Sequence, residues 1–186
     1  NVLPGVKNYE PDILSNYEAG FKTTWLDNRL RLNGAVYYED WEGIQYRLAT
    51  PGASGLSAIY NAGDARVYGA ELDFQALLDS FVLSGTMAYN DAQLSTNFCN
   101  IQSAANPNPF PNCSAAAGNV QSPAGTRLPN QPKFKGSVTA RYNFDWSGFD
   151  SFASATVNHQ TASRNTLGVR ENALLGGDSP GFTTVD

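Results

Sequence analysis

The chain has 186 residues, a formal net charge of −5, 41% hydrophobic residues and a mean hydropathy of −0.34. No apolar run approaches the roughly 20 residues that a membrane-spanning helix needs, but strands that show lipid only their alternate side chains are compatible with these values. The acidic balance argues against nucleic acid as a partner, and one histidine with two cysteines offers no zinc cluster. Residues 1–5 lack the features of a signal peptide, so we expect a processed N-terminus or an internal piece of a longer protein.

The first predicted strand covers residues 17–25, and the second begins at residue 30. In the first strand, one face carries Tyr17, Ala19, Phe21 and Trp25 and the other carries Glu18, Gly20, Lys22 and Thr24. This period of two predicts a strand between two unlike environments. Residues 26–29 supply a tight turn. The second strand is expected to run without a break to Tyr46, which is longer than most strands of soluble proteins.

A loop rich in Gly, Ser and Pro over residues 50–57 precedes the next pair of strands. The third strand is expected to resume near Ile59. Its alternation sets Tyr68, Ala70, Leu72, Phe74 and Ala76 against Gly69, Glu71, Asp73 and Gln75. Residues 78–80 turn the chain back into a fourth strand over 81–90.

An irregular stretch over residues 95–131 is rich in Asn, Pro, Ser, Ala and Gly and contains both cysteines. Alternation resumes over 133–144, and a short turn at 146–148 leads to a sixth strand over 151–161. A second long loop runs to about residue 181. Residues 182–186 are expected to open a seventh strand.

The lengths of the connections predict the fold. They strictly alternate along the chain, short at Asp27, Asp79 and Ser147 and long after Tyr46, Asn90 and Thr161. A meander with short turns at one end and long loops at the other is typical of outer-membrane barrels. The predicted fold is therefore all-β, an antiparallel up-and-down transmembrane β-barrel represented by about six or seven strands of a larger barrel. Aromatic residues near both strand ends fit girdles at the membrane interfaces.

Charge decides which face of the predicted strands meets lipid. A Lys or Arg on the lipid face at mid-membrane costs roughly 2–4 kcal/mol, whereas the lumen is wet. We therefore expect six charged side chains to point inward, namely Lys22, Arg31, Glu71, Asp73, Lys135 and Arg141. The apolar side chains between them, including Leu72 and Phe74, are expected to face outer-membrane lipid.

A series of short motifs, in this order, resembles the barrel of TonB-dependent outer-membrane receptors. They are YEPD (9–12), NYEAGFK (16–22), RLRLN (29–33), YYED (37–40), IQ (44–45), NAG (61–63), YGAEL (68–72), AYNDA (88–92), RLPNQP (127–132) and FTTVD (182–186). The resemblance spans nearly the whole chain. It implies that residues 1–186 belong to the C-terminal half of such a barrel domain, with residues 95–131 as a long extracellular loop.

The resemblance implies active transport across the outer membrane of a Gram-negative bacterium, through a barrel of about 22 strands. The plug of the family, its TonB-binding segment and its closing strands are not found in these residues. Partnership with the TonB complex is therefore implied only through a plug outside them, and the edge strands are expected to be open. The implied ligand is first a ferric siderophore, otherwise a cobalamin or an oligosaccharide, with residues 98–110 as candidate contacts.

Cys99 and Cys113 are predicted to form a disulfide, because the outer loops of such a barrel mature through an oxidising periplasm. In the chain-entropy model, closing a loop of about 15 residues contributes roughly 3 kcal/mol. Asn112 begins a glycosylation-type triplet, to which we assign no role in a bacterial outer membrane.

The remaining polar candidates are interpreted as non-catalytic. His159 could act as a base in an outer-membrane hydrolase, but we interpret it as a polar residue at the membrane interface. Its candidate partners would be Asp150, Ser151 and Ser154. Glu71 and Asp73 could form a paired-carboxylate site, but a solvated lumen wall is the favoured interpretation. We therefore predict no catalytic, cofactor-binding or metal-binding residue and no enzyme activity.

Two other interpretations of the strands stay open. A small closed outer-membrane barrel of about eight strands, with a structural or adhesive role, would need two further strands. A soluble carbohydrate-binding β-sandwich would bury Leu72 and Phe74 in the dry space between two stacked sheets.

Overall fold

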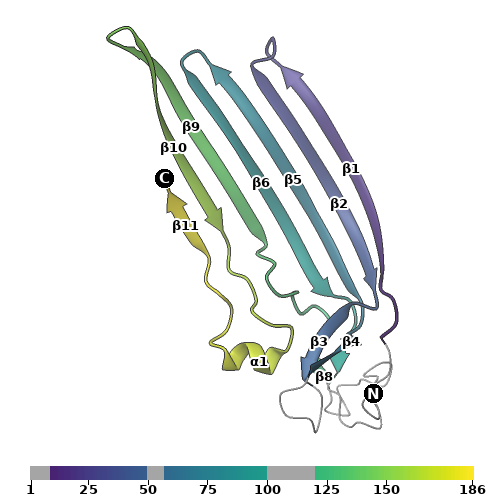
Figure 1. Cartoon of the computed structure of the whole chain (residues 1–186). Helices are drawn as coiled ribbons and strands as arrows, with labels where there is room; N and C mark the ends of the chain where they lie inside the picture. The colour runs from purple at the N-terminus through teal and green to yellow at the C-terminus, as the bar shows by residue number, and fades with distance from the viewer. Residues whose placement is uncertain (1–8, 50–56, 100–119) are drawn as a thin grey trace.

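A computed structural model describes residues 9–49, 57–99 and 120–186 of the chain. Its main feature is one sheet of seven antiparallel strands in the order β1-β2-β5-β6-β9-β10-β11 (Figure 1). These strands are β1 Ile13–Trp25, β2 Leu30–Glu42, β5 Ala65–Leu78, β6 Phe81–Leu94, β9 Phe134–Trp146, β10 Phe149–Gln160 and β11 Phe182–Val185. The smaller elements are β3 Gln45–Ala49 paired with β4 Ser57–Asn61, β7 Phe98–Cys99 paired with β8 Val120–Ser122, and the helix α1 Val169–Leu174.

Tight turns join the long strands at one end of the sheet. Between β1 and β2, Leu26, Asp27 and Asn28 have positive φ angles of 55°, 52° and 69°. Between β9 and β10, Ser147 and Gly148 have φ angles of 55° and 79°, as a two-residue type I′ hairpin requires. Figure 1 shows β3, β4, β8 and α1 at the opposite end. The predicted alternation of short and long connections is therefore confirmed.

The prediction of an unbroken strand from residue 30 to Tyr46 is wrong. The strand β2 ends at Glu42, and β3 begins at Gln45 in a different sheet. Between them, Gly43 adopts a φ of 65°, a conformation that glycine tolerates and that leaves the extended ladder. The Gly43 amide donates to Asp64 Oδ1 at 2.9 Å, and the Ile44 amide donates to the Gly63 carbonyl at 2.7 Å. These bonds redirect the chain out of the main sheet.

The two segments that were expected to be irregular contain regular structure as well. The strands β7 and β8 lie inside residues 95–131, and α1 lies in the loop before β11. A six-residue helix is too short to be stable alone in water. Here Asn172, only 5% exposed, accepts the amides of Asn165 and Thr166 at 3.0 and 3.3 Å and donates to Asp178 at 2.9 Å. Side-chain bonds that the periodicity does not reveal therefore hold α1 in place.

The strand register separates the sheet into two faces. Directly paired residues share a face, so each row can be followed from strand to strand. One row across all seven strands is polar and consists of Lys22, Asn33, Asp73, Thr86, Ser137, Asn158 and Thr184. The adjacent row on the other face consists of Thr23, Leu32, Phe74, Gly85, Val138, Val157 and Val185. The predicted alternation of the strands is thus confirmed, with Asp73 and Phe74 on opposite faces.

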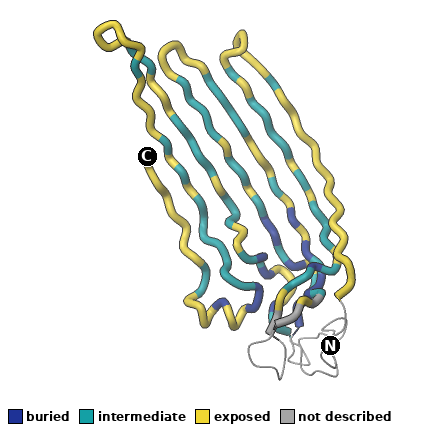
Figure 2. Tube along the Cα trace, in the orientation of Figure 1, coloured by how far each residue is buried: buried dark blue, intermediate teal, exposed yellow. Residues whose placement is uncertain are grey.

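Large hydrophobic side chains stay exposed along the apolar face. Tyr17 is 66% exposed, Val36 58% and Leu72 36%. Figure 2 shows exposed and intermediate residues along nearly the full length of the long strands. Leu72 therefore does not lie in the dry middle of a sandwich, as the soluble alternative requires. Among the described residues, no helix combines the length and the apolar character needed to cross a membrane.

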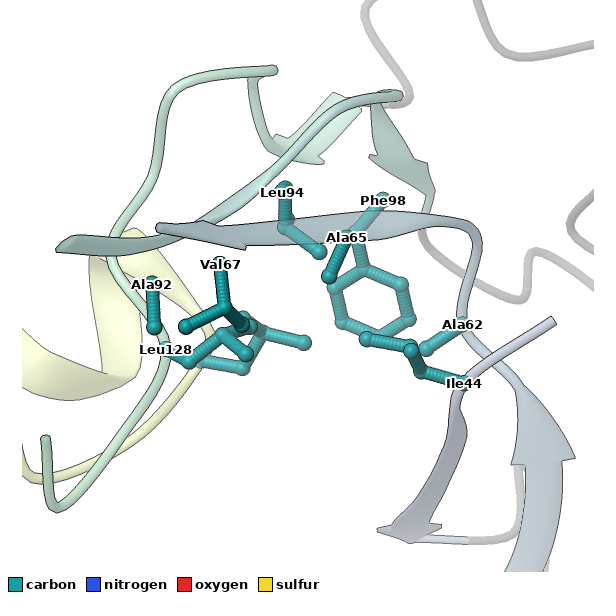
Figure 3. Close-up of a cluster of buried hydrophobic side chains, with 9 residues drawn as sticks. Ile44, Ala62, Ala65, Val67, Ala92, Leu94, Phe98 and Leu128 are labelled. Carbon is teal, nitrogen blue, oxygen red and sulfur yellow. The ribbon is translucent and has the colours of Figure 1, made fainter. Parts of the chain in front are cut away.

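Buried hydrophobic residues gather instead at the loop end of the sheet (Figure 2). The cluster consists of Ile44, Ala62, Ala65, Val67, Ala92, Leu94, Phe98, Leu128 and Leu167, eight of which are labelled in Figure 3. The ends of β5 and β6 contribute four of them, and the connections between the strands contribute the rest. Val67 lies six residues before Asp73, so the strand period of two places it on the polar face. The core therefore forms where connections fold onto that face.

Candidate functional site

The polar face of the sheet lines an open hollow of about 970 Å³. Four of the charged residues that were predicted to point inward line it, namely Lys22, Glu71, Asp73 and Lys135. Arg31 and Arg141 share this face, because they lie two residues from Asn33 and four from Ser137 on their strands. The predicted grouping of all six charged side chains on one face is therefore confirmed.

Charged groups of both signs lie along the polar face. Glu18, Glu39 and Glu71 line a second hollow of about 260 Å³, together with Tyr37. Lys135 lies in the same row as Glu71, because both pair with Ala88, and nearer the short turns the guanidinium of Arg141 lies 3.7 Å from the ring centroid of Phe152. Asp145 and Asp150, which pair beside the β9–β10 turn, continue this face, so the wall mixes carboxylates and cations along its length.

Hydrogen bonds between neighbouring strands fix part of the polar face. Asn33 Nδ2 donates to Asp73 Oδ1 at 2.8 Å, and the hydroxyls of Thr139 and Thr156 are 2.8 Å apart. The described residues contain no group of three or more His, Cys, Asp or Glu side chains that could hold a metal ion. The interpretation of Glu71 and Asp73 as a solvated wall stays a prediction.

His159 and its candidate catalytic partners are not brought together. His159 shares the apolar face with Met87 through their common partner Gly136, whereas Ser154 lies on the polar face. Ser151 is eight residues away on the same strand, which corresponds to roughly 26 Å. His159 Nδ1 lies 2.8 Å from Thr183 Oγ1, and its ring lies 6.1 Å from that of Phe134.

A buried carboxylate at the loop end of β6 was not predicted. Asp91 is 3% exposed and accepts hydrogen bonds from Tyr68 Oη at 2.9 Å, Gln93 Nε2 at 2.7 Å and Lys133 Nζ at 2.8 Å. The hydrogen bond to Asp91 raises the pKa of Lys133 above its ordinary value. The sequence contained a signal for this site, because Asp91 continues the apolar face of β6. A carboxylate that is buried on such a face needs a hydrogen-bond partner. The ion pair ties the end of β6 to the chain entering β9.

The predictions for the loop over residues 95–131, a ligand contact at Phe98 and a disulfide at Cys99, have different outcomes. Phe98 is fully buried and packs edge-on against Tyr46 with 6.1 Å between ring centroids, so its prediction as a ligand contact is wrong. Residues 100–110 and Asn112 lie outside the described residues. Cys99 is buried and is not a free thiol. Cys113 lies outside the described residues, so its pairing with Cys99 stays a prediction.

Comparison with known proteins shows relatives that are much longer than this chain. It is 30% identical, over 97% of its length, to the metal-pseudopaline receptor CntO of Pseudomonas aeruginosa, of which it covers 21%. Among solved structures, the ferric yersiniabactin uptake receptor FyuA of Yersinia pestis matches with a TM-score of 0.60 at 17% identity. The match covers 94% of this chain and 22% of FyuA. BauA, the ferric preacinetobactin receptor of Acinetobacter baumannii, matches with a TM-score of 0.57 at 14% identity, over 92% and 21% of the two chains.

The chain thus spans about a fifth of the length of these relatives. All three are named as receptors, in agreement with the expectation that the chain is not an enzyme. The family described as TonB dependent receptor-like, beta-barrel, matches residues 2–186. The fold and the sequence therefore agree, and the chain belongs to the TonB-dependent receptor β-barrel family.

Proposed function

We propose that the chain forms part of the barrel wall and outer loops of an outer-membrane receptor for the uptake of a scarce nutrient. A ferric siderophore is the first candidate ligand. The observation that carries the proposal is the two-faced sheet, in which a polar row crosses all seven strands while the alternate face exposes large hydrophobic side chains. One face suits a wet lumen and the other suits lipid.

The ligand class is supported by the relative of highest identity reported above. CntO is named as a receptor for metal-pseudopaline, so a complex of a metal with a small organic chelator fits this part of the family. Carboxylates, amides and cations on the polar face offer hydrogen bonds to the polar groups of such a complex. The same chemistry would serve a cobalamin or an oligosaccharide, which the experiment below distinguishes.

The energy source in this proposal is the TonB complex, reached through a plug that these residues do not include. The wall itself contributes a fixed polar surface in the outer membrane of a Gram-negative bacterium. Family membership supports this proposal over the two alternatives of a small structural barrel and a soluble β-sandwich.

Uptake by a strain that lacks the full-length gene tests the proposal. We expect loss of growth on one ferric siderophore or metal–chelator complex under metal limitation, and the same loss when tonB is deleted. Growth on cobalamin and on glycans as limiting nutrients should stay unchanged. Unchanged accumulation of every radiolabelled metal complex would contradict the siderophore proposal. A growth defect confined to cobalamin or to a glycan would identify that nutrient as the ligand in place of the siderophore. The proposal of an uptake receptor would then still hold.

A further inference from the structure

Three long connections meet at the loop end of the sheet. The first rim segment comprises residues 43–64 with β3 and β4, the second comprises 95–133 with β7 and β8, and the third comprises 161–181 with α1. In each segment we consider only the part that the structure describes. Hydrogen bonds and buried side chains join each segment to both of the others.

Leu167 of the third segment is bonded to both other segments at once. Its side chain is fully buried in the core cluster. Its amide donates to Tyr46 Oη in the first segment at 3.2 Å. Its carbonyl accepts from Ser122 Oγ in the second segment at 2.7 Å, and Ser122 is itself fully buried. One residue therefore joins chain segments that lie 121 and 45 positions away.

The first and second segments are joined directly as well. The Asp64 amide donates to Thr96 Oγ1 at 2.9 Å, and the Ser95 amide donates to the Asp64 carbonyl at 2.9 Å. The ring of Tyr46 packs edge-on against Phe98, and Figure 3 shows Phe98 beside Ile44 and Ala62. The two segments thus share apolar burial in addition to hydrogen bonds.

An ion pair joins the second and third segments at a different point. Arg127 of the second segment pairs with Asp178 of the third, and the two side chains are 29% and 30% exposed. Asp178 also accepts from Asn172 in α1 at 2.9 Å. Gln121 Nε2 in β8 donates to Glu171 Oε1 in α1 at 3.3 Å. The junction therefore does not depend on Leu167 alone.

We propose that the three segments form one cooperative structure, the rim unit, which is already folded before any ligand binds. Side chains that share one core are destabilised together when a central member is removed. An incoming ligand would then meet a preformed edge on the polar side of the wall, because Val67 and Ala92, which belong to the core, lie on that face. Three loops that order separately would instead have to lose conformational entropy on binding.

Hydrogen–deuterium exchange of the full-length protein in detergent, without ligand, tests this inference. In Leu167→Ala we expect amide exchange to rise by at least about 30-fold in β3 and β4 and in residues 120–128, as well as in α1. The matched control is Leu174→Ala in the same segment, where the leucine is 77% exposed. We expect less than about a twofold change from the control.

Tyr46→Phe keeps the ring and removes only the hydroxyl that accepts the hydrogen bond from the Leu167 amide. It should raise exchange in the third segment by about 2- to 10-fold, and it decides the question if Leu167→Ala fails to assemble. A rise in Leu167→Ala that stays within residues 161–181, or a Tyr46→Phe effect confined to β3 and β4, would overturn the rim unit. Because exchange is measured without ligand, this outcome is independent of whether the protein takes up a siderophore.

Discussion

The wall and the rim unit use aromatic side chains in opposite ways. Phe149 on the wall is 75% exposed, while Phe98 in the rim is fully buried. The wall has one layer, so its apolar face can be satisfied only by a nonaqueous surrounding such as lipid. The rim unit folds onto the loop ends of β5 and β6, and it buries its apolar groups as a soluble domain does. One chain therefore contains two folding environments, and substitutions should separate them.

The largest difference is expected for phenylalanine removal. Phe98→Ala should destabilise the rim by about 3–5 kcal/mol, because it leaves a cavity in a closed core. Phe149→Ala removes a ring beside a short turn and should cost less than about 1 kcal/mol. Limited proteolysis within the rim segments, quantified against denaturant, measures the difference. Equal protease sensitivity of the two variants would contradict the contrast between wall and rim.

A charge introduced on either face of the wall should give the next largest effect. Phe74→Lys places an ammonium on the face assigned to lipid and should cost roughly 2–4 kcal/mol, which cripples assembly. Asp73→Lys changes the neighbouring residue on the polar face and should still assemble, although it loses the bond from Asn33. The heat-modifiable mobility of the folded barrel on gels measures both. Similar folded fractions for the two variants would refute the assignment of faces.

Close packing inside the wall predicts a smaller effect. A Cβ added at Gly69 would lie 2.4 Å from the Tyr89 carbonyl oxygen and 2.5 Å from the Tyr37 ring. Gly69→Ala should therefore destabilise the wall by about 1–3 kcal/mol, since the backbone has to shift. At Gly136 the nearest atoms belong to the Phe134 ring, at 3.1 Å, so Gly136→Ala is the milder control. Urea unfolding of both variants compares them, and a larger loss at Gly136 would disprove the packing argument.

The smallest effect is expected at the short turns. Arg29 and Asp79 form a 3.7 Å ion pair whose side chains are 64% and 89% exposed. Such pairs contribute about 0–1 kcal/mol, and asparagine tolerates the φ of 51° at Asp79. Asp79→Asn should therefore change the urea midpoint very little. A loss comparable with that of Phe98→Ala would show that the turn has a role that exposure does not reveal.

The wall was largely predictable from the sequence, while the rim was not. A strand in a two-sided environment repeats its pattern every two residues, so Tyr68 to Gln75 already records which side chains share a face. The rim depends on contacts such as Leu167 with Tyr46, which are 121 positions apart and leave no local period. The prediction of Phe98 as a ligand contact failed for the same reason. Gly43 shows the intermediate case, since a single left-handed residue ended a strand whose pattern continued.

The central claim, that the two faces of the sheet meet water and lipid, can be measured residue by residue along β5. Single nitroxide labels at positions 70 to 77 of the full-length protein in bilayers would report collisions with oxygen and with a water-soluble nickel chelate. We expect the odd positions, which include Asp73, to favour the nickel chelate and the even positions, which include Phe74, to favour oxygen. Accessibility that does not alternate between neighbouring positions would contradict the account.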